Sequence, residues 1–474
     1  MKKIINMLLY VSMAVSLQAN AAADEHYAAR NGQVPSSPYS TWATAASNIQ
    51  DAVNAANTND TVWVGAGRYT APANAVFLLG TNIVFIDKPM MLRSSNGVPA
   101  DTVLDGEGLN RAAVFWITNN MTSSPSGLNG FTVRNCYATN MGGGILFYQR
   151  YGVWTAEVRN CIVADNLVEY GTNALTGGGN LGRGIYGGGI CCYCYDRKSG
   201  LLVTNSVLRN NRALSGGTDD WQIAYGGAIW ARTDGLKQIV FSRVESNTAP
   251  SAGGVYFTRG EGLVANSGFL GNRAITNRTY WNILNVIIGG GLYMGSSVGT
   301  VRNSLFYENY SQGYGGAIVA FGSTWLDVQN CTIVSNRGDL NYGGSGTAIS
   351  RRSGGVTVCN TIIYSNQFKE VHIASAANVF FTNCCLTTTN IWLSSTVTNP
   401  AGSGNITNAP LFVNPGLYDY RLQVNSPCIN TGLNQPWMEG ALDLDLHSRK
   451  DRYSGRVDMG CYEKIFNGMI YKIH

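Results

Sequence analysis

The sequence predicts an all-β solenoid, a chain wound into stacked coils of short strands. Two motifs alternate along it. The first is an apolar residue, any residue, Asn, and then Cys, Ser or Thr. The second is Gly-Gly followed by Gly or Ala and an aliphatic residue. The shortest repeat is about 23 residues, which suits one coil of three short strands and three bends.

Composition supports a turn-rich β protein and excludes some partners. Of the 474 residues only 13% are charged and 57 are glycine, and the formal net charge is +5. The repetition overrides the several domains that this length would otherwise suggest. So small and scattered a positive excess does not predict a nucleic-acid partner.

The N-terminus has the pattern of a secretory signal peptide. Lysines precede an apolar run from Ile4 to Leu17, and small residues follow up to Ala23. We therefore predict a signal peptide over 1–21, cut after Ala21 or Ala23. The run is too short to span a bilayer, so we expect a secreted or cell-surface protein without a transmembrane segment.

Residues 22–76 are predicted to form an N-terminal cap. Ile49, Val53 and Ala56 share one face of a helix predicted over 47–57, with Ser47 or Asn48 as its N-cap. A strand is predicted next, over 61–69. An amphipathic helix before the first strand of a solenoid covers the open end of its apolar core.

The solenoid is predicted over 77–395, where the two motifs repeat. The Asn motif recurs at 133–136, 158–161, 203–206, 264–267, 301–304, 328–331, 358–361 and 381–384, and 240–243 fills a gap with Ser242 in place of Asn. A second Asn follows five or six residues later, as in Asn140, Asn166, Asn211, Asn272, Asn309, Asn336 and Asn366. Asn at equivalent bends adopts left-handed geometry readily and can bond to the next Asn above.

The Gly-Gly motif begins at Gly142, Gly187, Gly226, Gly253, Gly289 and Gly315, with a degenerate copy at 346–349. Aligning Gly226 with Gly253 also aligns Trp230 with Phe257, Arg232 with Arg259, and Asp234 with Glu261. The alternation of the two motifs resembles the right-handed parallel β-helix of pectate-lyase-like proteins, which carry asparagine ladders at one bend. The resemblance covers 61–393 and implies that fold.

The tail, 396–474, is interpreted as a C-terminal cap module. Its segments PLFVNPGLYDYRLQVNSPCINTG and GRVDMGCYE resemble the C-terminal part of exported bacterial β-helix proteins of the choice-of-anchor Q type. Few residues follow Glu463, and they contain no apolar anchor.

A binding face is predicted on the strand that follows each Gly-Gly. Side chains alternate along a strand, and equal positions of neighbouring coils stack about 4.8 Å apart. Insertions over 167–186, 213–225 and 274–288 project from one side and are expected to border this face. The outward aromatic residues, which we assign to substrate binding, are Tyr148, Tyr193, Trp230, Phe257 and Tyr293.

Charged residues beside these rings are the candidate catalytic groups: Arg232, Asp234, Arg259 and Glu261. In pectate-lyase-like enzymes the corresponding strand and bend line the substrate groove. Aromatic faces stack on sugars, and arginine binds carboxylates in bidentate fashion. For a lyase, one Arg would neutralise a uronate while another group removes the C5 proton. For a hydrolase, Asp234 and Glu261 would be the two carboxylates.

Two function classes follow from this face. The first is an exported protein that binds or cleaves polysaccharide, as a lyase or glycoside hydrolase. The second is a non-enzymatic adhesin or structural protein, because stacked rings and paired charges also stabilise an exposed solenoid face by packing alone. We expect a monomer in either class.

Cysteine and acidic residues give weaker predictions. Of the 11 cysteines, Cys428 and Cys461 lie outside the repeats and are the predicted disulfide, whereas Cys136, Cys161, Cys331 and Cys384 are assigned to one buried column. Cys191, Cys192 and Cys194 do not have zinc-finger spacing, and neither do the four histidines. Asp443, Asp445 and Asp458 are a candidate Ca²⁺ set or ordinary turn residues.

Overall fold

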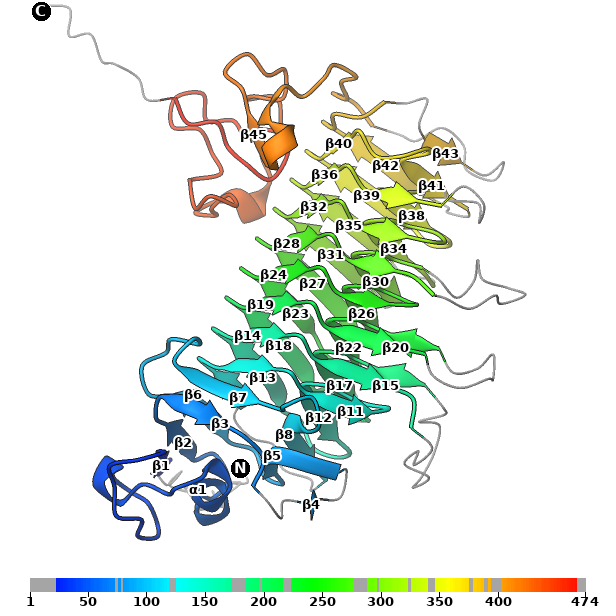
Figure 1. The fold of residues 1–474 in the computed structure, drawn as a ribbon. Coiled ribbons are helices and arrows are strands. Elements are labelled where there is room, and N and C mark those ends of the chain that lie inside the picture. Colours follow the sequence, from blue (N-terminus) through cyan, green and yellow to red (C-terminus); the bar gives the residue numbers. More distant parts are fainter. Residues whose placement is uncertain are drawn as a thin grey trace, which may run out of the picture.

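The computed structural model describes residues 23–72, 76–77, 80–118, 125–171, 184–195, 198–215, 223–276, 288–295, 298–322, 325–339, 346–374, 378–387, 391–393 and 402–466. The chain is a right-handed parallel β-helix, as the sequence predicts, with its coils stacked along one axis (Figure 1). The predicted signal peptide lies outside the described residues. No helix among the described residues is long and apolar enough to cross a membrane.

Four sheets, here numbered I to IV, form the solenoid, and sheet III is confined to its middle coils. Sheet I contains β1 (Glu25–Ala28), β2 (Thr61–Val64), β6 (Met91–Ser94), β9 (Ser126–Asn129), β13 (Thr155–Arg159), β18 (Gly200–Thr204), β23 (Lys237–Val240), β27 (Glu261–Ala265), β31 (Val298–Arg302), β35 (Trp325–Gln329), β39 (Val356–Cys359) and β42 (Val379–Thr382). Sheet II contains β3 (Gly67–Tyr69), β7 (Thr102–Asp105), β10 (Thr132–Arg134), β14 (Ile162–Ala164), β19 (Val207–Arg209), β24 (Arg243–Glu245), β28 (Gly268–Leu270), β32 (Leu305–Tyr307), β36 (Thr332–Val334) and β40 (Ile362–Tyr364).

The remaining strands of the solenoid belong to two further sheets. Sheet III contains β11 (Tyr137–Thr139), β15 (Leu167–Glu169), β20 (Arg212–Leu214), β25 (Thr248–Ala249), β29 (Arg273–Ala274), β33 (Tyr310–Ser311) and β37 (Arg337–Gly338). Sheet IV contains β4 (Val76–Phe77), β5 (Gly80–Ile86), β8 (Arg111–Ile117), β12 (Ile145–Gln149), β17 (Ile190–Cys194), β22 (Ile229–Arg232), β26 (Val255–Thr258), β30 (Leu292–Gly295), β34 (Ile318–Ala320), β38 (Ile349–Arg351), β41 (Val371–Ile373) and β43 (Ile391–Leu393).

Short elements lie outside these sheets. β16 (Ile185–Tyr186) pairs with β21 (Ala224–Tyr225), and β44 (Phe412–Asn414) pairs with β45 (Asp419–Leu422). Among the described residues, the helical segments are α1 (Ile49–Ala55), η1 (Trp42–Thr44), η5 (Pro415–Leu417) and η6 (Pro436–Met438).

The N-terminal helix is shorter than predicted, but its apolar face is the predicted one. Asn48 is the N-cap, because its side chain accepts a hydrogen bond from Asp51 N at 2.9 Å. Ile49 and Val53 enter the main core. The strand predicted over 61–69 bends into β2 and β3, and parallel stacking begins before residue 77, because β1 pairs with β2.

A buried asparagine ladder holds the coils in register. Each Nδ2 donates to the Oδ1 of the next Asn at 2.8–3.0 Å, along Asn166, Asn211, Asn247, Asn272, Asn309, Asn336 and Asn366. Asn140, predicted to belong here, instead exchanges hydrogen bonds with Gly171. On the preceding coil the position equivalent to Asn166 is occupied by Cys136, whose N–H donates to Asn166 Oδ1. Cys136 is therefore not in the column of Cys161, because the first copy of the motif is displaced by one bend.

The Asn of the first motif occupies a left-handed position that faces outward. Its φ lies between 47° and 50° in Asn160, Asn205, Asn266, Asn303, Asn330, Asn360 and Asn383. Sheet I pairs Val203 with Ile239 and Thr204 with Val240. The residue of the next coil that corresponds to Asn205 is therefore Phe241. Phe241 has the same left-handed backbone, with φ 50°. The prediction that Ser242 replaces the Asn is wrong, since Ser206 N donates to Ser242 Oγ in the Cys/Ser/Thr column.

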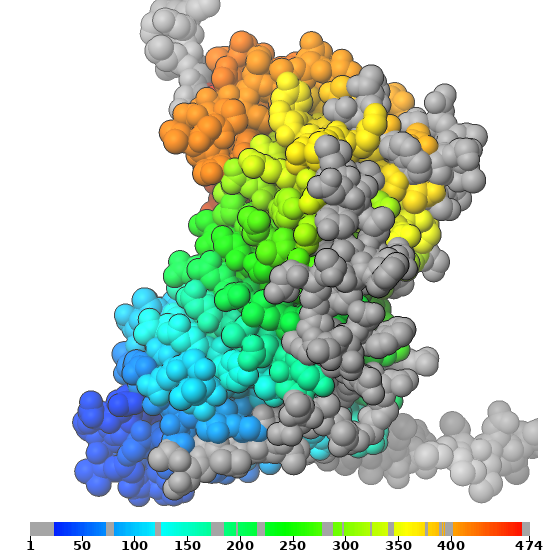
Figure 2. Space-filling model, turned by 45° about the vertical axis from the view of Figure 1, so that its right-hand side comes forward, coloured from blue at the N-terminus to red at the C-terminus, as the bar shows by residue number. Residues whose placement is uncertain are grey.

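The C-terminal module, 402–466, folds back along the outside of sheet II. Phe412, Tyr420 and Cys428 pack with Leu305 and Ile362 of the solenoid in a second apolar core. In Figure 1 the module, orange to red, lies beside β32, β36 and β40. In the space-filling view it rests on the yellow and green coils (Figure 2). It covers a lateral face as well as following the last coil.

Candidate functional site

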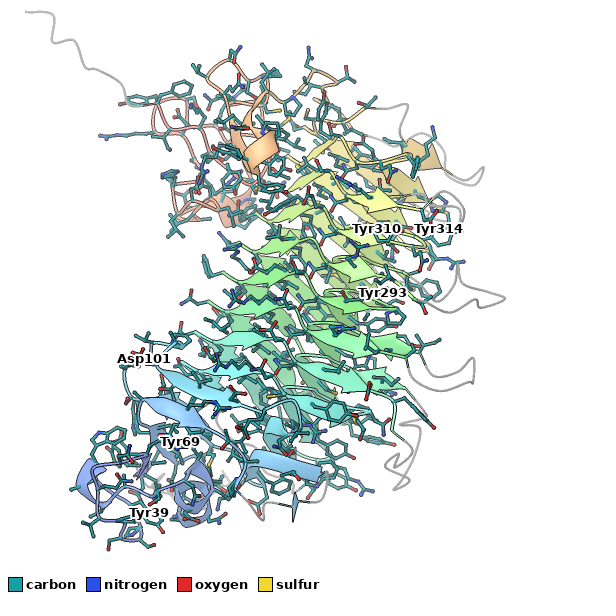
Figure 3. All side chains as sticks on the ribbon, in the orientation of Figure 1. Tyr39, Tyr69, Asp101, Tyr293, Tyr310 and Tyr314 are labelled. Atoms are coloured by element: carbon teal, nitrogen blue, oxygen red, sulfur yellow. The ribbon has the colours of Figure 1, made fainter. Side chains whose placement is uncertain are left out.

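An aromatic ladder covers the outer face of sheet IV. One column is formed by Trp116, Tyr148 and Tyr193, with ring centroids 3.9 Å and 5.6 Å apart. A second column is formed by Trp230, Tyr256 and Tyr293, in which Tyr256 and Tyr293 stack at 4.2 Å. Figure 3 shows Tyr293 on the same flank as Tyr314.

Phe257 is not part of this ladder, which corrects its assignment to substrate binding. Its side chain is fully buried in the main core. Sheet IV pairs Ile229 with Val255, so Gly227 rather than Gly226 corresponds to Gly253. Ala252 takes the left-handed position, with φ 56°, that Gly226 fills in the coil before. A coil one residue shorter therefore turns Phe257 inward and brings Tyr256 outward.

The ladder rings pack on one another and are largely covered. Tyr148, Tyr193, Trp230 and Tyr293 are 7%, 2%, 4% and 5% exposed. Burial also raises the pKa of Tyr186 to about 12. The insertions expected to border this face lie largely outside the described residues.

The predicted catalytic residues occupy the bend between sheets IV and I on two successive coils. Arg259 Nη1 lies 3.9 Å from Asp234 Oδ1, and the two side chains are 51% and 28% exposed. Glu261 begins β27 and is exposed. Arg232 lies over the ring of Tyr193 at 5.6 Å. Arg232 pairs with Thr258, so the two arginines are not in the same column.

Lys237, which the sequence analysis missed, ties the two bends together. Its Nζ donates to the carbonyl oxygens of Thr233 at 3.0 Å, Gly235 at 3.3 Å and Arg259 at 2.6 Å. Burial lowers its pKa to about 8. Its three N–H donors are matched by three acceptors, so this amine positions the bend that carries Asp234 and Arg259. The sequence does contain a signal for this residue, because it is a lysine at an inward strand position that is otherwise apolar.

The predicted disulfide is absent, because all eleven cysteines are free and buried. Cys428 packs in the second apolar core with Cys385, whose Sγ donates to Asn408 O at 3.2 Å. Cys461 instead lies beside Thr332, and its backbone N–H donates a hydrogen bond of 3.1 Å to Thr332 Oγ1. The two thiols therefore have different neighbours in the core under the module.

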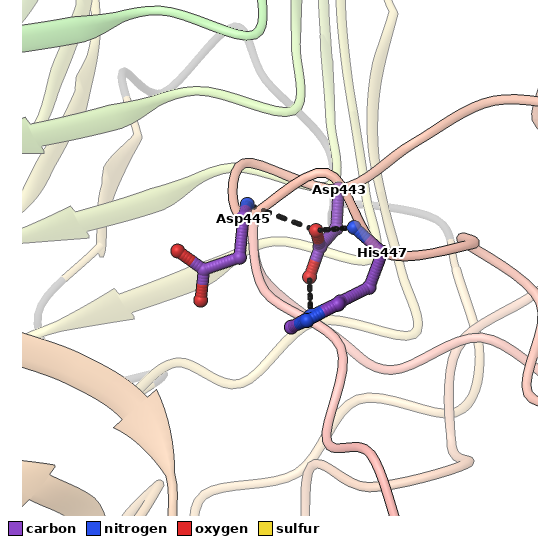
Figure 4. A group of neighbouring side chains, drawn as sticks. All are labelled: Asp443, Asp445 and His447. Carbon is purple, nitrogen blue, oxygen red and sulfur yellow. Dashed lines mark hydrogen bonds and ion pairs between the residues drawn. The ribbon is translucent and has the colours of Figure 1, made fainter.

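The candidate calcium residues do not form one open set. Asp443 Oδ1 accepts from the N–H groups of Asp445 and His447, and His447 Nδ1 lies 3.6 Å from Asp443 Oδ2 (Figure 4). Arg421 binds both carboxylate oxygens of Asp445, at 2.5 and 2.8 Å. Asp458 accepts from Asn430 N and Lys464 N. Asp443, Asp445 and His447 bring one ligand atom each to within 4.8 Å of one another, but Asp458 is not part of this group. The predicted set of three aspartates therefore does not form, and a cation at Asp445 would have to displace Arg421.

Comparison with solved structures finds a likeness to a pectate lyase. The crystal structure of pectate lyase Pel9A is similar, with 15% sequence identity over 94% of this chain and 97% of that chain and a TM-score of 0.48. No protein-family model and no curated protein matches the chain.

Proposed function

We propose that this is an exported protein that binds an acidic polysaccharide along the bend between sheets IV and I and cleaves it by elimination. The observation that carries the proposal is the gathering of Arg232, Asp234, Arg259 and Glu261 on two successive coils. Arg259 and Glu261 are exposed, so a ligand has access to them. The signal-peptide pattern supports export.

The chemistry assigns a role to each group. Arg259 would leave its long contact with Asp234 for a uronate carboxylate, because a bidentate pair is stronger than an ion pair at 3.9 Å. Once the charge of that carboxylate is neutralised, the C5 proton of the uronate becomes easier to remove. Asp234 or Glu261 would accept it, and the electrons would form the C4–C5 double bond as the C4 glycosidic oxygen leaves. Arg232, held over Tyr193, would contact the neighbouring sugar.

A non-enzymatic surface protein is the second candidate. The observation in its favour is that the predicted stacking rings are at most 7% exposed and pack on one another. A face of this kind stabilises the solenoid without any ligand.

The experiment is a screen of the purified protein against acidic and neutral polysaccharides, following ultraviolet absorbance of unsaturated uronates and reducing ends together. Elimination predicts both signals, lost in Arg259→Ala and kept in Arg30→Ala, an exposed arginine near the N-terminus. Reducing ends without unsaturated product would assign the two acids to hydrolysis. Neither signal, with no binding to acidic polysaccharide, would favour the surface protein.

A further inference from the structure

A cleft lies on another sheet, where the C-terminal module meets the solenoid. The cleft has a volume of about 750 Å³. Phe241, Arg243 and Tyr307 line it from the solenoid, and Tyr418, Leu446 and Tyr462 line it from the module. This volume is within the usual range of about 300–1,000 Å³ for small-molecule sites.

Phe241 is the residue that sets this cleft apart from the rest of the solenoid. The equivalent positions of the coils on either side are Asn205 and Asn266, which tolerate the left-handed backbone. A phenylalanine at φ 50° is strained there, and such strain concentrates where a protein uses the side chain. Phe241 is 51% exposed, so it is not retained for packing.

The surroundings of Phe241 suit a ligand with an apolar face and a polar rim. Tyr418 is 51% exposed, and its ring lies 5.2 Å from that of Tyr307. Two polar residues, Asn205 and Asn266, also line the cleft. A sugar ring has this character, with one face of C–H groups and hydroxyls around its edge, and it stacks on aromatic rings.

Charge in the cleft favours a neutral sugar. Arg243 Nη2 already pairs with Glu245 Oε2 at 2.7 Å. Arg421, which lies over the ring of Tyr462, is held by Asp445 and Asp419. The positive charges of these arginines are therefore already neutralised by acidic side chains. A uronate would have to displace one of those side chains in order to bind.

We propose that the cleft binds a short stretch of neutral polysaccharide, with Phe241 as the stacking platform and Tyr418 as the opposing wall. The site is distinct from the bend proposed for cleavage, which lies between sheets IV and I. It would hold the protein on neutral chains that accompany its acidic substrate.

The test measures binding by isothermal titration calorimetry with hexasaccharides of β-linked glucose, mannose and xylose. The decisive variant is Phe241→Asn, which restores the residue of the neighbouring coils and should fold at least as stably as the wild type. We expect it to bind about tenfold more weakly or worse, since loss of one stacking contact removes roughly 1.4 kcal/mol. Tyr418→Ala should weaken binding similarly.

The controls separate this site from the proposed active site. Tyr453→Ala removes another exposed aromatic ring of the module that does not line the cleft, and Arg259→Ala alters the bend; both should bind like the wild type. Binding by none of the hexasaccharides, or equal binding in Phe241→Asn, would overturn the proposal. A wild-type dimer that Phe241→Asn converts to a monomer would also overturn it, by assigning the cleft to a second copy of the chain.

Discussion

Arg449 and Asn303 lie 146 positions apart in the sequence, and Arg449 Nη1 donates a hydrogen bond of 3.1 Å to Asn303 Oδ1. Asn303 in turn donates from Nδ2 to Leu442 O at 2.7 Å. The same left-handed position on the other coils under the module also donates to its backbone: Asn266 to Leu442, Asn330 to Asp458, Asn360 to Leu433 and Asn383 to Thr431. The repeat thus supplies a row of outward amides that positions the module and one wall of the cleft.

Arg449→Met should detach or loosen the module. The Arg449 side chain is fully buried, and its Nη2 lies 2.9 Å from Glu463 Oε1. Burial raises the pKa of Glu463 to about 9, so this carboxyl takes up a proton when its partner is removed. The variant also leaves Asn303 Oδ1, Asp458 O and Gly460 O without their donor, and an unsatisfied buried polar group typically costs about 1–3 kcal/mol. Limited proteolysis should cut the tail faster than in the wild type. The double variant Arg449→Met with Glu463→Leu should recover part of the loss, and unchanged proteolysis in the single variant would contradict the assignment.

Asn272→Ala should destabilise the solenoid. The Asn272 amide accepts from both N and Nδ2 of Asn247, and it donates to Val244 O at 2.7 Å and Asn309 Oδ1 at 2.9 Å. The variant leaves several buried polar groups without partners, each costing about 1–3 kcal/mol. Denaturant unfolding is the measurement. Asn210→Ala, at an exposed position that bonds to Asp165, is the control and should change stability far less.

Phe257→Ala should be more damaging than Tyr256→Ala. Phe257 lies wholly inside the main core, and a large cavity there typically costs about 3–5 kcal/mol. Tyr256 packs on the outer ladder, stacked on Tyr293. The comparison of unfolding free energies therefore tests the register of sheet IV directly. Equal losses, or a greater loss for Tyr256→Ala, would restore the alignment that the Gly-Gly repeat alone suggests.

These residues show what the sequence predicts and where it fails. The alternating motifs predict the β-helix and most of the asparagine ladder, because each coil must place Asn and Gly at the same bends. They misplace Phe257 and the Phe241–Ser242 pair by one residue, and a slip of one reverses the face of a side chain. They misplace Cys136 because the first copy of the Asn motif lies at a different bend of its coil. Lys237 and the docking of the module depend on contacts between distant coils, for which no local pattern exists.

The stability of the protein should depend on pH through His372. His372 stacks beside Tyr314, with ring centroids 5.5 Å apart, and burial together with Arg352 lowers its pKa to about 4 from 6.5. Between these two values the unfolded chain binds more protons at this residue than the folded chain. Protonation therefore favours unfolding, and the contribution of His372 to stability falls as pH drops from 6.5 to 4. His372→Phe and His372→Gln carry no titrating group here, so each should lose less stability than the wild type across this window. Urea unfolding at a series of pH values measures the difference, and parallel curves for all three proteins would show that His372 titrates equally in both states.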